Sequence, residues 1–161
     1  MSVRSFTEFC FNYEKEIGLA VIEKRLKLMP AALPKTGGRA GGHAYINDTA
    51  AGAALRNAEG VAKVEIELPG RAGGAPSVLT VVKPEEWLKV VRFTRDYYGA
   101  STQGNLIRLR YTEKESVDDV CKKLFVSRKQ YFIMRTEVLS FAAGVARGLG
   151  LIARRTPAGG M

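Results

Sequence analysis

Residues 116–139 read SVDDVCKKLFVSRKQYFIMRTEVL, and this stretch decides the fold of the C-terminal part of the chain. Ser116 and Ser127 stand eleven residues apart, and each precedes a segment whose apolar residues recur at helical spacing. Asp119 lies three residues after Ser116, where a capping box has Glu or Gln. The residues between the two segments, 124–126, read Leu-Phe-Val and include no glycine. The pattern predicts two serine-capped helices joined by a tight apolar turn.

Each of the two predicted helices carries its apolar residues on one side. The stripe on the first helix consists of Val117, Val120, Cys121 and Leu124, and that on the second of Tyr131, Met134, Val138, Phe141 and Ala142. Because the linker is short, both stripes can share one core at a steep angle, which is the geometry of a helix-turn-helix. In that motif the first turn of the second helix enters the major groove of DNA. An ordinary helical hairpin with solvated charges is the alternative.

The outward side chains of these helices suit nucleic acid. An arginine in the first turn of the second helix offers a two-pronged fork to guanine, and a glutamine can pair with adenine. Lysines at the end of the first helix suit contacts with phosphate. The residues predicted to contact DNA are Ser127, Arg128, Lys129, Gln130, Arg135, Lys122 and Lys123.

Phe132 and Ile133 interrupt this polar face, because both lie away from the apolar stripe of the second helix. They could touch thymine methyl groups. They could instead pack against the N-terminal helix, a second subunit or RNA polymerase, since a large apolar pair is seldom left bare. We predict that protein covers both side chains, either in a dimer or through the N-terminal helix.

Charge supports a polyanionic partner. The chain has 161 residues and a net charge of +9. Residues 101–161 hold 11 Lys and Arg against 5 Asp and Glu, which gives +6, so two thirds of the excess lies in the shorter part. Basic chains favour polyanions, although a basic face can also serve solubility alone.

The remaining bulk features predict a cytoplasmic protein. No apolar run reaches about 18 residues, so no membrane span is expected. Charged residues interrupt the N-terminal segment, which therefore does not resemble a secretory signal. Cys10 and Cys121 each sit within a helical apolar pattern, and we expect buried free thiols in a reducing compartment.

Upstream of residue 116 the pattern is mainly helical. One helix is expected over residues 6–29, with its apolar stripe running as far as Leu26 and Leu28, and a long helix begins at Pro84 and ends at Gly99. The other elements expected are a helix at 49–58, strands at 61–68 and 77–82 that pair as a hairpin, and a helix at 102–111.

The predicted fold class is mainly α with a small β-hairpin and a C-terminal helix-turn-helix. We expect three regions: an N-terminal helical region over 1–100 with the hairpin at about 61–82, a DNA-binding module over 101–145, and a basic flexible tail over 146–161.

Two short motifs, at residues 109–111 and 126–128, resemble region 4 of sigma-70 factors. Leu109-Arg110-Tyr111 is similar to the family's first helix end, and Val126-Ser127-Arg128 is similar to the element that opens its recognition helix. Among proteins of this size, the chain resembles phage late-gene transcription regulators of the ArpU/RinA and antiterminator type. The resemblance implies a phage- or prophage-encoded protein that binds double-stranded DNA in transcription control, through Ser127, Arg128 and Lys129.

Two other roles stay open. A small terminase-like DNA-packaging factor would also carry a helix-turn-helix, and it would form a large ring. A module that contacts RNA polymerase is the third reading, in which the basic face is incidental. RNA polymerase and a second copy of the chain are therefore candidate partners beside DNA.

Catalysis and cofactors are not expected. His43, the one histidine, stands in a glycine-rich loop without nearby carboxylates, which argues against a histidine triad or metal cluster. The glycine-rich loops at 37–42 and 70–75 share the sequence Arg-Ala-Gly-Gly. They do not match a phosphate loop, because Lys35-Thr36 precede the glycines instead of following them.

Overall fold

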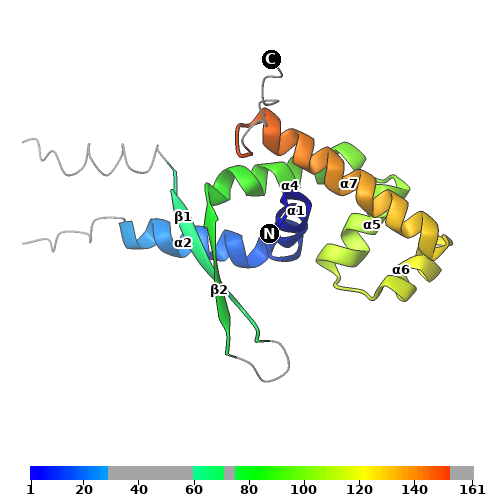
Figure 1. Cartoon of the computed structure of the whole chain (residues 1–161), viewed down its shortest axis with the longest axis horizontal. Helices are drawn as coiled ribbons and strands as arrows, with labels where there is room; N and C mark the ends of the chain where they lie inside the picture. Colours follow the sequence, from blue (N-terminus) through cyan, green and yellow to red (C-terminus); the bar gives the residue numbers. More distant parts are fainter. Residues whose placement is uncertain (29–59, 71–74, 153–161) are drawn as a thin grey trace, which may run out of the picture. The chain divides into compact units, whose positions relative to one another are not determined.

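The chain is mainly α-helical with one small β-hairpin, as predicted (Figure 1). The structure, a computed structural model, describes residues 1–28, 60–70 and 75–152. The helix predicted at 49–58, the loop at 37–42, His43 and most of the second glycine-rich loop lie outside the described residues, as do positions 153–161 of the predicted tail. None of the described helices is long and apolar enough to cross a membrane.

Two compact units make up the chain. The first joins residues 1–17 to residues 86–161, and the second comprises residues 18–85. This division differs from the predicted boundary at residue 100, because the first helix, α1 (Val3–Asn12), packs against the last, α7 (Arg128–Gly148). Residues 1–17 therefore belong to the same unit as residues 116–139.

The single helix predicted over residues 6–29 is wrong. α1 ends at Asn12, Tyr13 breaks the helical backbone with a φ of −117° and a ψ of 24°, and α2 (Glu14–Leu28) follows at once. Hydrophobic spacing continues across this break, so periodicity alone could not reveal it. The predicted apolar stripe also fails at its far end, where Leu26 and Leu28 are exposed.

The helix predicted from Pro84 is confirmed as α4 (Pro84–Tyr98). Its buried residues are Trp87, Val90, Val91 and Thr94, and Tyr98 is half-buried. Gly99 follows with a φ of +46°, a backbone region that favours glycine.

The helix predicted at 102–111 is present in two forms. α5 (Thr102–Ile107) is α-helical, and the chain continues as a π-helix, η2 (Arg108–Thr112). Gly104 lets the start of α5 approach the preceding turn, since a Cβ there would lie 1.9 Å from the Gly99 carbonyl oxygen. Leu106, Ile107 and Leu109 are buried.

The second unit is built on the predicted hairpin. Strands β1 (Lys63–Leu68) and β2 (Ser77–Val82) pair antiparallel, with Val64 opposite Val81 and Ile66 opposite Leu79. Val64, Ile66 and Val81 are buried, whereas Lys63, Glu65 and Glu67 are exposed, so the side chains of β1 alternate between core and solvent. Within the same unit Lys24 of α2 donates to the Lys63 carbonyl oxygen at 2.7 Å, and Arg25 pairs with Glu85 at 2.7 Å.

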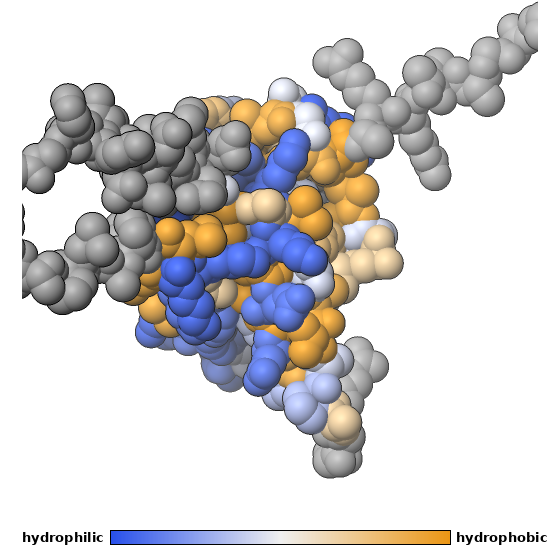
Figure 2. All heavy atoms as spheres, turned by 90° about the vertical axis from the view of Figure 1, so that its left-hand side faces the viewer, coloured by the Kyte–Doolittle hydropathy of each residue, from blue (hydrophilic) through white to orange (hydrophobic). Residues whose placement is uncertain are grey.

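The face drawn in Figure 2 mixes hydrophobic and hydrophilic side chains, with hydrophilic residues interspersed between apolar ones. Single exposed apolar residues are ordinary on protein surfaces, so this face by itself indicates no site.

Candidate nucleic-acid interface

The connection between α6 (Val117–Leu124) and α7 is short and well defined. Ser116 caps α6, since its Oγ accepts the backbone N–H of Asp119 at 3.2 Å. Phe125 ends α6 in the left-handed region, with a φ of 54° and a ψ of 41°, although its side chain is 95% exposed. The Val126 N–H then bonds the Cys121 carbonyl oxygen at 3.0 Å, which closes the turn.

Ser127 begins α7 with a complete capping box. Its Oγ accepts the N–H of Gln130 at 3.2 Å, while the Gln130 side-chain oxygen accepts the Ser127 N–H at 2.9 Å. The structure thus gives both residues a role in starting the helix. This role occupies the oxygen of Gln130, the acceptor with which a glutamine meets the amino group of adenine.

Both predicted apolar stripes face the core of the first unit. Val120, Cys121, Tyr131 and Val138 are buried, and Met134 is half-buried. Further along α7 the chain also buries residues that the prediction omitted: Leu139, Ala143 and Ala146. Phe141 is half-buried and stacks on Tyr97, with ring centroids 4.3 Å apart.

Cations gather around the turn between α6 and α7. Arg128 and Lys129 are exposed in the first turn of α7, and Lys122 is exposed near the end of α6. Arg128 Nε lies 3.2 Å from Asp118 of α6, but the two side chains are 68% and 63% exposed, so the pair is weak. Within the described residues Lys122 and Lys129 form no ion pair.

Lys123, a predicted phosphate contact, is paired with a carboxylate. It forms an ion pair with Glu115, and this hydrogen bond raises the pKa of the Lys123 ammonium group. The same two residues, with Asp119 and Lys122, line a small hollow beside the start of α6. Lys123 therefore carries its charge next to carboxylates, whereas Lys122 does not form such a pair.

Arg135 does not join the other predicted contacts. Its guanidinium donates through Nε and Nη2 to the Glu8 carboxylate of α1, with Nε 2.8 Å from Oε1. This hydrogen bond raises the pKa of Arg135. Tyr111 donates its hydroxyl to the same carboxylate at 3.2 Å, and burial raises the pKa of Tyr111 far above its usual value. Arg135 therefore holds α1 on α7.

The N-terminal helix does not cover Phe132 and Ile133, contrary to one form of the prediction. The two side chains are 47% and 58% exposed. The reason is the Glu8–Arg135 pair, because it places α1 against the side of α7 that carries Arg135. Cover by a second subunit, the other form of the prediction, is untested.

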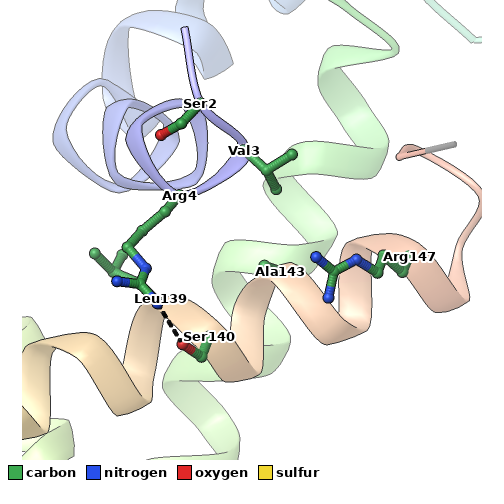
Figure 3. A pocket seen from close by; sticks show the side chains of 7 residues that line it. All are labelled: Ser2, Val3, Arg4, Leu139, Ser140, Ala143 and Arg147. Atoms are coloured by element: carbon green, nitrogen blue, oxygen red, sulfur yellow. Dashed lines mark hydrogen bonds between the residues drawn. The ribbon is translucent and has the colours of Figure 1, made fainter. Parts of the chain in front are cut away.

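A basic hollow of about 530 Å³ lies between the start of α1 and the second half of α7 (Figure 3). Arg4 extends from α1 toward α7 and donates to Ser140 Oγ at 3.4 Å, and Arg147 lines the same hollow from the far end of α7. Its lining holds two guanidiniums and two serines but no carboxylate, a set that suits an anion. Sequence reasoning missed Arg4 and Arg147, because only the packing of α1 on α7 brings them together.

Comparison with known proteins yields no match: no protein-family model fits the chain, and neither a curated protein nor a solved structure is similar to it. The likeness to sigma-70 region 4 therefore rests on the residues of this chain alone.

Proposed function

We propose that the chain binds double-stranded DNA through the first turn of α7 and the end of α6. The observation that supports this most is the cluster of exposed cations directly at the Ser127-capped start of α7. Arg128, Lys129 and Lys122 are all exposed there, on two helices that share one core. In a helix-turn-helix, the start of the second helix is the part that meets DNA, which supports this assignment.

The individual roles follow from side-chain chemistry. Lys122, Lys123 and Lys129 contact phosphates as point charges, and Arg128 reads a guanine through its fork. The Arg128–Asp118 pair opposes the reading step only weakly, since exposed ion pairs contribute about 0.2–1 kcal/mol. Because Glu115 holds Lys123 in an ion pair, Lys123 contributes less to phosphate binding than Lys122 and Lys129.

Transcription control is the biological role that we assign to this binding. Its support is the similarity of Leu109-Arg110-Tyr111 and Val126-Ser127-Arg128 to sigma-70 region 4, as in phage late-gene regulators. The proposal places the protein in the cytoplasm of a bacterial cell that carries the phage or prophage. Two buried free thiols, Cys10 and Cys121, suit such a reducing compartment.

Direct titration of a fluorescent duplex with the full chain tests the proposal. With three to four phosphate contacts, affinity should fall roughly 40- to 150-fold between about 50 and 200 mM salt. Absence of binding at about 50 mM salt, or binding that does not respond to salt, would overturn the proposal.

A further inference from the structure

The apolar pair Phe132 and Ile133 lies on the same side of α7 as Lys129. An α-helix turns about 100° per residue, so positions four apart come close to one line along the helix. Lys129, Phe132, Ile133 and Thr136 accordingly share one side, and all four are exposed. Tyr131 is buried, and its ring meets the Phe132 ring edge-on, with centroids 5.2 Å apart. We call these four residues the outer face of α7.

The charge around the outer face of α7 indicates the chemistry of the partner that covers it. Residues 127–136 contain three cations and no carboxylate, and the first acid of α7 is Glu137. One of the cations, Arg135, is held by Glu8, and Arg128 forms a weak, exposed pair with Asp118. Lys129 of the outer face forms no ion pair within the described residues. A surface that combines apolar side chains with unneutralised positive charge complements a groove lined by phosphates.

Within the major groove one apolar group stands out. Each A·T pair presents the C5 methyl group of thymine there, while the other groups are hydrogen-bond donors and acceptors. Phe132 and Ile133 hold no polar side-chain atom and cannot satisfy those donors and acceptors. They can, however, remove a methyl group from water, which is favourable for both surfaces.

We infer that Phe132 and Ile133 select A·T base pairs by contacting thymine methyl groups, an inference that rests on the proposed DNA binding. Lys129 beside them supplies affinity that is independent of sequence, Arg128 reads a guanine, and the apolar pair supplies a further part of the preference. The same contact accepts 5-methylcytosine, because its methyl group occupies the corresponding place in the groove.

Two pairs of duplexes isolate the methyl group. The first pair consists of alternating dA–dT and alternating dA–dU, each about 24 base pairs or roughly two helical turns long. The second consists of alternating dG–dC with and without a 5-methyl group on cytosine. Within each pair the hydrogen bonds and phosphates are unchanged, and the methyl group is the only chemical difference.

The full chain should bind each methylated duplex more tightly than its partner, by about fourfold for each methyl group covered. In Phe132→Ser and Ile133→Ser, the ratio of the affinity for the methylated duplex to that for its unmethylated partner should fall toward one. The affinity for the unmethylated duplexes should stay close to that of the parent. Leu149→Ser is the matched control, because Leu149 is also 47% exposed but lies beyond the end of α7, and its ratio should stay unchanged. Thermal unfolding of each variant verifies that it folds.

Three results would overturn the inference. If the parent binds both members of each duplex pair equally, and its affinity falls with salt as proposed, then DNA binding is supported but the contact with thymine methyl groups is ruled out. If the parent binds no duplex at low salt, the proposed function fails first and the inference with it. If Phe132→Ser converts a dimer to a monomer in sedimentation and leaves the methyl ratio intact, the outer face is an interface between copies.

Discussion

Arg135 of α7 and Glu8 of α1, 127 residues apart in the sequence, form a two-pronged ion pair. Both side chains are largely shielded, at 30% and 21% exposure, and Tyr111 donates a third hydrogen bond to the same carboxylate. The pair joins the N-terminal helix to the helix that carries the candidate DNA face. It also decides which side of α7 stays open to a partner.

Replacing Arg135 with alanine should destabilise the fold by about 1.5–3 kcal/mol, because the Glu8 carboxylate stays shielded without its charged partner. Urea unfolding measures this cost. Lys89→Ala is the matched control, since Lys89 forms only an exposed pair with Glu86 and should cost under about 0.5 kcal/mol. Equal costs for the two variants would contradict the structural role of Arg135, as would a loss of duplex binding in folded Arg135→Ala.

Phe125→Gly should stabilise the protein. Phe125 holds a left-handed backbone that costs an ordinary residue about 1–2 kcal/mol, and its side chain is 95% exposed, so its removal forfeits little burial. Glycine loses more chain entropy on folding, which leaves a net gain of about 0.5–1 kcal/mol. Phe125→Ala separates the causes, because it removes the ring but keeps the Cβ. A gain in Phe125→Ala that matched the gain in Phe125→Gly would show that backbone strain is not the reason.

Cys10 should resist alkylation in the folded protein. Burial raises the pKa of its thiol to about 12, so the reactive thiolate is scarce at pH 8.5. Because the folded pKa lies above the unfolded value of about 8.5, this group stabilises the fold fully below that pH and loses its contribution as pH rises toward 12. Mass spectrometry of maleimide labelling on Cys121→Ala, with and without urea, measures the difference. Rapid labelling of the native protein would contradict the burial of Cys10.

Elements with local signals could be predicted from the sequence. Strand β2 is found at the predicted residues 77–82, helix α4 lies between Pro84 and Gly99 as predicted, and the Ser127 cap forms as the spacing of serine and apolar residues indicated. These signals lie within a few residues of the structure that they specify. The mainly helical class with one hairpin follows from them.

Features that depend on distant contacts could not be predicted. Nothing in the sequence near Arg135 distinguishes it from a solvent-facing arginine, because its partner Glu8 lies at the other end of the chain. The break at Tyr13 could not be predicted for a related reason, because the apolar spacing continues through it. The exposure of Ile133 likewise depends on where α1 docks, which no local pattern encodes.

Arg128 should separate specific from general binding. Arg128→Ala should weaken the preferred duplex by about 1–3 kcal/mol and relax preference at one base pair, while random DNA is bound nearly as before. Asp118→Asn should act in the opposite direction, because it frees Arg128 from its carboxylate partner and should tighten binding by roughly 1.5- to 5-fold. Binding-site selection followed by titration measures both effects. Weaker binding by Asp118→Asn would contradict the competition between Asp118 and DNA for Arg128.

The salt dependence of Lys129→Ala tests the proposed interface most directly. Lys129 is exposed in the first turn of α7 and forms no ion pair within the described residues, so its removal should leave the fold unchanged and delete one phosphate contact. Lys89→Ala removes the same charge from α4 and serves as the control. Titration of one duplex at several salt concentrations should give Lys129→Ala a log–log slope shallower than the parent's by about one, and Lys89→Ala the parent's slope. Identical slopes for the parent and both variants would contradict the account.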